Sequence, residues 1–381
     1  MPLILRLLKV FGVWGETRYR YKYILVFMCY CFGIVIPKVF FGYPTLEASI
    51  RGYAELILET NVFAGMLLFY VRNDHFKLLV AELRSFVSIV FRAYQPKFIR
   101  SNLVKLNLQI HKYTMFYCLC MCGVCTMYCM APLWSNYYGY TIAQAARNNG
   151  TPFEFSLYME QDFYWIDSRT SLLGYSVCTV FMFPLMYLCA YTATVKMLAV
   201  WNIIKYCQSV LRIVVMKLKY MKTFPDPREQ IDALSEIREL HQRALRCAEL
   251  LELVLQPLLL MQFVLCILIW GTMMLYFSLS GINVRFLNMF LLFLFVSIET
   301  LGYCYLGTQL SQESINVGQE LYDCDWSNFD GETRKRIAFM IMRAQCRVGL
   351  TAAKFCLVNM EQFRAMLNMS YSLFVVLKDV F

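Results

Sequence analysis

Long apolar runs alternate with charged segments along the whole chain. Seven of these runs approach the length of about 20 residues that crosses the roughly 30 Å hydrocarbon core of a bilayer. They cover residues 23–41, 53–71, 113–133, 172–199, 257–280, 286–306 and 350–377. The segments between them are too short for a large separate soluble domain. The pattern therefore predicts an all-α membrane protein with seven transmembrane helices.

Basic residues fall almost entirely on one side of these spans. Segments 1–22, 72–112, 200–256 and 307–349 contain 27 Lys and Arg residues, whereas the connections on the other side contain five. Because basic loops stay in the cytoplasm, we expect a cytoplasmic N-terminus and an extracellular C-terminus. This orientation is opposite to that of a G-protein-coupled receptor. Topology and attraction to anionic lipid explain the net charge of +10, so we expect no nucleic-acid partner.

Two cytoplasmic segments carry the apolar spacing of amphipathic helices. Asp226 is placed to cap a helix that begins at Pro227 and runs directly into the fifth span. Apolar residues between positions 231 and 255 recur at three- and four-residue steps, and residues 334–343 form a second helix of this kind. Both helices extend the protein into the cytoplasm. Their apolar stripes need a partner there, either neighbouring segments of the same chain or another subunit.

Two features near the N-terminus leave alternatives open. The tail is either frayed or forms a short interfacial helix with an apolar face made of Leu3, Leu7, Val10 and Trp14. In the second span, Glu55 and Glu59 either face protein or water, or snorkel to the interface.

The last span is apolar but carries a polar stripe. Lys354, Glu361 and Asn368 are seven residues apart, which places them on one face of a continuous helix, with Tyr371 beside them. Such a face does not suit lipid, so it belongs either to a water path or to a buried polar network. Phe374 and its apolar neighbours follow at the outer end. Polar lining below an apolar constriction suits a gate that closes by dewetting.

The outer connection 134–171 is rich in tyrosine and tryptophan. It forms either an ordinary aromatic belt or a lid over an outer cavity. Asn149 begins an Asn-Gly-Thr glycosylation sequon on the side that we expect to be outside, and the Pro152 that follows makes it a poor acceptor.

Residues that would indicate catalysis or a metal site are scarce. Five of the sixteen cysteines cluster in the third span, but a helix distributes them around its axis at about 100° per residue. The three histidines, His75, His111 and His241, fall in cytoplasmic segments, where we expect them to be solvated. No phosphate-binding loop, nucleophile elbow or dinucleotide fingerprint is present. We therefore predict no enzyme activity, no cofactor and no metal.

The C-terminal third resembles the insect odorant receptor family. The residues that carry the resemblance are Tyr322 and Trp326, then the run from Leu350 to Phe355, then Ser370-Tyr371-Ser372-Leu373-Phe374. The Ser370-Tyr371 pair favours the odorant branch over the related gustatory receptors. The chain also lacks the long insert that the shared odorant co-receptor carries in the region of residues 200–256, so it is similar to a ligand-tuning subunit.

The resemblance implies a ligand-gated, nonselective cation channel in the plasma membrane of olfactory sensory neuron dendrites. It implies a heterotetramer with the co-receptor and a small volatile odorant as ligand. It also divides the chain into three parts: residues 1–199 with the odorant-binding outer half, residues 200–349 as a cytoplasmic anchor with two spans, and residues 350–381 as the pore-lining helix.

The resemblance also assigns residues to these roles. The expected odorant contacts are Phe63, Met127, Tyr128, Tyr175, Thr179, Phe183, Phe286, Leu287 and Phe290. The expected pore and gate residues are Lys354, Glu361, Asn368, Tyr371, Phe374 and Leu377. Three alternatives are a gustatory-type channel, a G-protein-coupled receptor and a transporter. The receptor alternative requires an extracellular N-terminus, and the transporter alternative predicts internal repeats, which we do not find.

Overall fold

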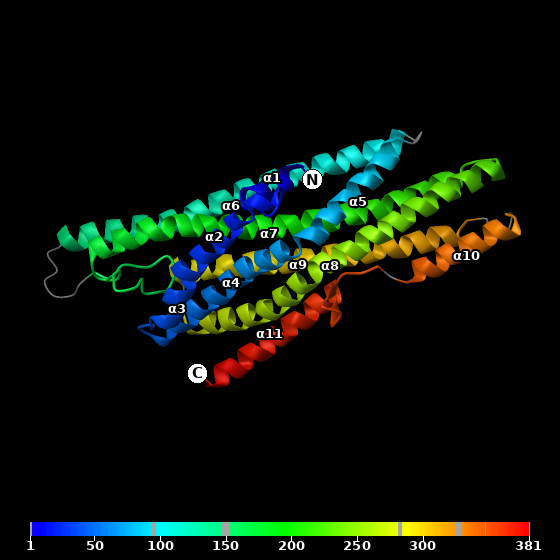
Figure 1. Cartoon of the computed structure of the whole chain (residues 1–381). Helices are drawn as coiled ribbons and strands as arrows, with labels where there is room; N and C mark the ends of the chain where they lie inside the picture. Colours follow the sequence, from blue (N-terminus) through cyan, green and yellow to red (C-terminus); the bar gives the residue numbers. More distant parts are fainter. Residues whose placement is uncertain are drawn as a thin grey trace.

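The computed structural model describes residues 2–92, 97–145, 153–280, 284–324, 326, 329–346 and 348–380, and the chain there is almost entirely helical (Figure 1). The elements are α1 (Pro2–Val10), η1 (Thr17–Tyr19), α2 (Tyr21–Tyr30), η2 (Cys31–Val35), α3 (Ile36–Phe40), α4 (Leu46–Val71), α5 (Asn73–Arg92), α6 (Lys97–Ala145), α7 (Leu172–Met221), α8 (Pro227–Leu279), α9 (Val284–Tyr322), α10 (Gly331–Gln345), β1 (Thr351–Ala352), β2 (Cys356–Leu357) and α11 (Met360–Val380).

Seven helical segments span the membrane, as the hydropathy pattern predicted. Six of them are long and apolar enough to be recognised by composition within the described residues: the continuous α2–η2–α3 segment, α4, α6, α7, α8 and α9. The seventh is α11, which has 21 residues and is more polar. The fold is therefore an all-α, seven-helix membrane bundle.

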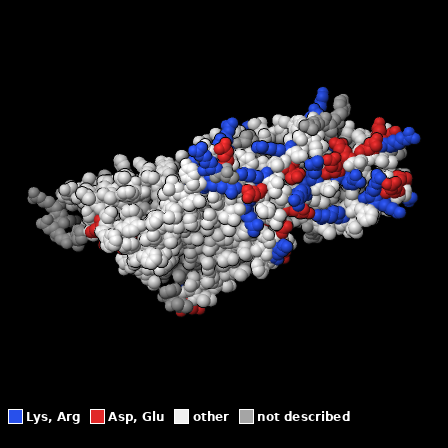
Figure 2. Space-filling model, viewed as in Figure 1, with Lys and Arg blue, Asp and Glu red and all other residues white. Residues whose placement is uncertain are grey.

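Several spans continue far beyond the bilayer. Helices α6, α7 and α8 have 49, 50 and 53 residues, about twice the length that a membrane needs. Their extensions meet α5 and α10 at one end of the molecule (Figure 1). Figure 2 shows that the Lys, Arg, Asp and Glu side chains gather at this end, whereas the other half of the surface is almost uncharged. The charged end is the cytoplasmic end, which places the N-terminus inside and the C-terminus outside.

The two predicted cytoplasmic helices are confirmed, each with an aspartate cap. The Asp226 carboxylate accepts a hydrogen bond from the Arg228 backbone N–H at 2.9 Å, and α8 begins at Pro227. Asp330 caps α10 in the same way. The apolar stripe of α8 packs against α5 and α7, and α10 packs against α9. Part of the cytoplasmic partner is therefore the chain itself.

Two boundaries differ from the sequence-based expectation. The N-terminal tail forms α1, but its buried side chains are Ile4, Leu5 and Leu8. Val10 of the expected face is exposed, because α1 packs on α6 and α7 instead of lying flat on lipid. Residues 134–145, which we expected to begin the outer loop, are the last turns of α6.

Candidate ligand-binding and pore-lining sites

An aromatic cluster closes the outer half of the bundle. Residues 153–171 fold back over α6 and α7, and the Phe155 ring stacks on Tyr175 with centroids 4.7 Å apart. Asn136 of α6 donates a hydrogen bond to the Tyr175 hydroxyl at 2.8 Å and another to the Ser156 carbonyl at 2.7 Å. Phe153, Phe155 and Tyr158 therefore form a packed cover that is held to two helices, whereas Trp165 is 92% exposed.

A chain of buried ion pairs fastens this cover to α3 and α4. The Glu55 carboxylate lies 2.6 Å from the Lys38 ammonium and 2.9 Å from the Arg51 guanidinium. Arg51 also reaches Glu160 at 3.2 Å, and Arg169 reaches Glu160 at 2.9 Å. Of the alternatives for Glu55, the structure supports the protein-facing one, because this side chain is 1% exposed. Sequence reasoning missed Lys38 and Glu160, although a lone charge inside an apolar segment is a signal of such a pair.

Several of the expected odorant contacts meet beneath this cover. Tyr128 is buried and donates a hydrogen bond to the Tyr158 carbonyl at 3.1 Å. Thr179 is buried one turn after Tyr175, with its hydroxyl bonded to the Tyr175 carbonyl. Phe183 packs beside Tyr128 as a half-buried neighbour. These side chains from α6 and α7 pack close to one another and combine apolar surface with a few hydroxyl groups.

The remaining expected contacts are placed elsewhere. Phe63 of α4 is fully buried and stacks on Tyr30 with centroids 4.5 Å apart. Met127 is 72% exposed and Leu287 is 55% exposed, so both face the surroundings of the chain. Phe286 and Phe290 form a separate ring cluster with Phe277 of α8.

A second buried ion pair lies deeper in the bundle. The Lys196 ammonium of α7 is 3.0 Å from the Glu299 carboxylate of α9, and both side chains are completely buried. Gln262 of α8 accepts a hydrogen bond from Lys196 at 3.1 Å and donates to Thr300 at 3.1 Å. Tyr303 donates to Glu299 at 2.7 Å. This polar network joins α7, α8 and α9 within the bundle, and sequence reasoning missed it.

The predicted helix over residues 350–377 is wrong in its first third. Residues 351–357 form the β1–β2 hairpin, and Ala353 and Lys354 at its turn have φ of 49° and 63°. Helix α11 begins only at Met360. Lys354 therefore lies in a turn outside α11 and does not share a face with Glu361 and Asn368.

The hairpin fixes where the last span starts. The Thr351 hydroxyl donates to the Glu252 carboxylate of α8 at 2.6 Å. The Thr308 hydroxyl of α9 accepts from the Met360 backbone N–H at 3.1 Å, and the Asn359 side chain accepts from the Gln362 N–H at 2.7 Å. Two long helices and a side-chain cap thus position the first turn of α11.

Helix α11 has two distinct faces. Phe363 packs edge-to-face on Trp270 of α8, Met366 is fully buried, and Phe374 and Leu377 are half-buried against the core. The opposite face leaves exposed side chains at Glu361, Asn368, Tyr371, Val375 and Val376. Three of the predicted pore residues therefore lie on the exposed face, while Phe374 and Leu377 lie on the flank that contacts the chain itself.

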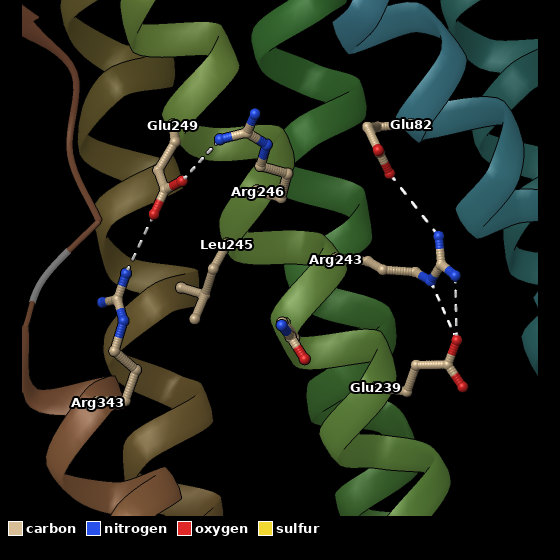
Figure 3. Close-up of a pocket in the computed structure, with 8 residues that line it drawn as sticks. Glu82, Glu239, Arg243, Leu245, Arg246, Glu249 and Arg343 are labelled. Carbon is tan, nitrogen blue, oxygen red and sulfur yellow. Dashed lines mark hydrogen bonds and ion pairs between the residues drawn. The ribbon is translucent and has the colours of Figure 1, made fainter.

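A cavity of about 500 Å³ lies at the cytoplasmic end, between α5, α8 and α10 (Figure 3). Arg243 contacts Glu239 at 3.1 Å and Glu82 at 3.8 Å. Arg343 of α10 contacts Glu249 of α8 at 3.6 Å. Because positive and negative side chains pair across the cavity, it offers no excess charge to a ligand. The pairs instead join α5 and α10 to α8.

The two histidines His241 and His111 differ in their exposure. His241 of α8 is 4% exposed, so the expectation of a solvated side chain is wrong there. This position lies on the face of α8 that packs against neighbouring helices. His111 is exposed, as expected. Asn149 lies outside the described residues.

The fold and these sites define a seven-helix membrane protein with a cytoplasmic N-terminus. A sequence profile of the 7tm odorant receptor family matches residues 45–371. The chain is 25% identical over 171 residues to odorant receptor 19a of Drosophila melanogaster, which covers 45% of this chain and 44% of that receptor. It is 31% identical over 127 residues to odorant receptor 22c of the same organism, which covers 33% of this chain and 30% of that receptor. The chain aligns with less than half the length of these relatives.

Among solved structures, the chain is similar to the insect olfactory receptor OR5 from Machilis hrabei in complex with eugenol. The TM-score is 0.70 with 16% sequence identity, over 100% of this chain and 97% of that chain. A second structure of the same receptor gives a TM-score of 0.62, also at 16% identity. At this identity, the likeness establishes the fold. With most of its length matched by the family profile, the chain belongs to the 7tm odorant receptor family. This membership agrees with the prediction that it is a receptor and not an enzyme.

Proposed function

We propose that this chain is the ligand-tuning subunit of an odorant-gated, nonselective cation channel. It assembles with the odorant co-receptor as a heterotetramer in the plasma membrane of olfactory sensory neuron dendrites. The observation that carries this proposal is the exposed polar face of α11. The cytoplasmic N-terminus argues against a G-protein-coupled receptor.

The argument for conduction starts from the cost of polar groups in lipid. Glu361, Asn368 and Tyr371 lie on the exposed face of a membrane helix whose other face is packed against α8 and α9. A lone chain would present these groups to hydrocarbon, which is expensive. Assembly around a central water path removes that cost, because each subunit turns this face inward. The apolar side chains of Val375 and Val376 at the outer end then provide a constriction that closes by dewetting.

The argument for odorant binding rests on the interior beneath the aromatic cover. Tyr128, Tyr175, Thr179 and Phe183 offer large apolar surfaces with a few hydroxyl groups, as small-molecule sites do. Among the relatives, OR5 of Machilis hrabei has been solved with eugenol, a small organic molecule. In this proposal, ligand binding favours the conformation in which the outer ends of the α11 helices separate.

The proposed division of labour follows the chain. Residues 1–199 supply most of the ligand site, residues 200–349 supply the cytoplasmic anchor, and residues 350–381 supply the hairpin and the pore helix. The cavity pairs in Figure 3 support the anchor role, because they fix α5 and α10 to the extension of α8.

The first test records currents from cells that express the chain with and without the co-receptor, across a panel of volatile ligands. The expected result is an odorant-evoked cation current only when both subunits reach the surface. Absence of current with every ligand, despite surface labelling of both subunits, would refute the channel.

The second test scans α11 with single cysteines and a water-soluble thiol reagent during activation. Cysteines at positions 361, 368 and 371 should be modified and should change the current. Cysteines at 366 and 370, on the buried face, are the matched controls and should not react. Equal labelling of both faces would argue against a pore-lining helix.

A further inference from the structure

One buried carboxyl group in the outer half of the bundle takes part in no ion pair with a described residue. The buried charged side chains in the described part of the chain are Lys38, Arg51, Glu55, Glu59, Glu160, Lys196, Lys217 and Glu299. Seven of these take part in ion pairs, and Glu59 takes part in none among the described residues. Glu59 is 2% exposed, and its Oε2 atom accepts no hydrogen bond from any described residue.

The position of Glu59 places this carboxyl group beside the predicted ligand site. Glu55, Glu59 and Phe63 follow one another at four-residue steps on one face of α4, and all three are buried. On the outer side, the Glu55 carboxylate forms ion pairs with Lys38 and Arg51. On the inner side, the Phe63 ring stacks on Tyr30. Glu59 lies between these two layers.

Neighbouring helices complete the surroundings of this carboxylate. Glu59 interacts electrostatically with Lys38 of α3, whose ammonium donates its hydrogen bond to Glu55 at 2.6 Å. It also interacts with Tyr30 of α2, Tyr128 of α6 and Cys189 of α7. Tyr30 is already bonded to the Thr60 hydroxyl at 2.7 Å, and Tyr128 to the Tyr158 carbonyl at 3.1 Å. The nearby hydroxyl groups are therefore committed to other partners, which leaves the Glu59 carboxylate to accept from a ligand.

A second acceptor lies in the same part of the bundle. The side-chain N–H₂ of Gln161 donates to the Gly33 carbonyl at 3.2 Å and lies 3.3 Å from the Met182 sulfur. Its Oε1 is buried and has no partner among the described residues. The two atoms without a partner among the described residues, Glu59 Oε2 and Gln161 Oε1, are both hydrogen-bond acceptors. A buried acceptor without a donor costs free energy that a ligand with N–H groups recovers.

We propose that Glu59 is the specificity-determining residue of the ligand site and that the site takes small molecules carrying a protonated amine. An ammonium group supplies the missing donors and a positive charge that pairs with Glu59 directly, since the Lys38 ammonium is bonded to Glu55. Phe63 and Tyr128 then flank the carbon skeleton. A carboxylic acid brings a like charge and no donor when ionised, so the site rejects it. This inference rests on the proposed function, since it names the ligand class of that same site.

The test compares ligands that share a carbon skeleton and differ in one group. The probes are 2-phenylethylamine, 2-phenylethanol and phenylacetic acid, together with hexylamine, hexanol and hexanoic acid, applied to cells expressing both subunits. The unmodified chain should respond to the amines at concentrations at least about tenfold below those needed for the matched alcohols, and not to the acids. Glu59→Gln keeps the shape but removes the charge, and it should abolish the amine preference.

Two further variants separate the site effect from other causes. Glu59→Asp retains the carboxylate and should retain the amine preference. Glu47→Gln removes an exposed carboxylate at the outer start of α4, which accepts from Ser280 at 2.8 Å, and should change nothing if the effect is local to Glu59. An equal loss in Glu47→Gln would overturn the inference in favour of general attraction of cations to the surface.

The outcomes distinguish this inference from the proposed function. Currents evoked by acids or alcohols, with Glu59→Gln behaving as the unmodified chain, would overturn the amine site and leave the channel standing. Absence of any current despite surface expression would overturn the channel. In that case, thermal unfolding of the purified chain still tests the site, because bound 2-phenylethylamine should raise the midpoint in the unmodified chain and not in Glu59→Gln. Equal midpoints would overturn the inference.

Discussion

At the scale of single residues, the bundle depends on charges that the membrane cannot solvate. The Lys196–Glu299 pair is completely buried, so removal of one partner leaves the other uncompensated. Lys196→Met or Glu299→Gln should lower the free energy of unfolding by about 3–5 kcal/mol. Thermal unfolding of the purified protein, together with the fraction that reaches the cell surface, measures this loss.

The double variant Lys196→Met with Glu299→Met should recover much of the loss, because both charges are gone. Lys219→Met is the matched control, because this lysine is 61% exposed in its pair with Glu320. The substitution should change the free energy of unfolding by less than about 1 kcal/mol. If the single variants unfold at the same temperature as the unmodified chain, the pair has no structural role.

His241 predicts a pH dependence of stability. Burial, and then the Arg343 guanidinium, lowers its pKa from 6.5 to about 4. Below pH 6.5, His241 therefore becomes protonated in the unfolded chain. In the folded chain it becomes protonated only near pH 4. Stability is complete above pH 6.5 and falls as the pH drops towards 4, by at most about 3 kcal/mol.

Thermal unfolding between pH 7.5 and 5 tests this linkage. His241→Gln should flatten the decline, whereas His111→Gln, at an exposed position, should leave it unchanged. A decline of the same size in His241→Gln would assign the acid sensitivity to other groups.

At the scale of elements, the contact between α9 and the hairpin positions the last span. A Cβ atom added at Gly307 would lie 2.2 Å from the Val358 carbonyl oxygen, which belongs to the backbone and cannot turn away. Gly307→Ala should therefore displace the hairpin, cost about 1–3 kcal/mol and weaken gating, because the α11 start moves with it. Unfolding midpoints and ligand-evoked currents report the two effects.

Gly123→Ala on α6 serves as the matched control for that substitution. An added Cβ there meets no atom within 4 Å, so the variant should be as stable as the unmodified chain or slightly more stable, since alanine favours helix. Normal gating in Gly307→Ala would mean that α11 is positioned without this contact.

Hydropathy and capping were enough to predict most helices, because both signals are local in the sequence. The start of α8 follows from Asp226 and Pro227, which need no tertiary information. The β1–β2 hairpin was not predictable in the same way. Its left-handed turn at Ala353 and Lys354 is held by partners such as Glu252 and Thr308, which are about 50 or more residues away. The apolar run over residues 350–359 therefore predicts a continuation of the helix, although the structure has a hairpin there.

The candidate site was predictable in part for a related reason. The family resemblance suggested Tyr128 and Met127 alike, yet Tyr128 is 7% exposed and Met127 is 72% exposed. Neighbouring residues on a helix point about 100° apart, so the choice depends on how α6 is rotated in the bundle. Packing against α7 sets that rotation. The sequence of an almost uniformly apolar span does not indicate which of its faces packs.

At the scale of the whole molecule, the surface shown in Figure 2 is divided into an almost uncharged membrane half and a charged cytoplasmic half. In the cytoplasmic half, apolar side chains that remain exposed have no lipid to cover them. Phe339 and Met342 of α10 are 67% and 59% exposed, and Phe355 of the hairpin is 82% exposed. Exposed apolar side chains of this kind suit contact with another subunit.

Substitutions on α10 therefore give the last prediction. Phe339→Gln combined with Met342→Gln should leave the fold of the chain intact, because both side chains are exposed, but should reduce co-purification with the co-receptor and the current by about tenfold or more, as loss of interface anchors does. Arg334→Gln combined with Lys335→Gln changes two exposed polar residues of the same helix and is the matched control. The proposal that α10 joins subunits fails if the apolar pair can be replaced without loss of assembly, or if the control pair weakens assembly equally, since the latter would point to charge and not to apolar contact.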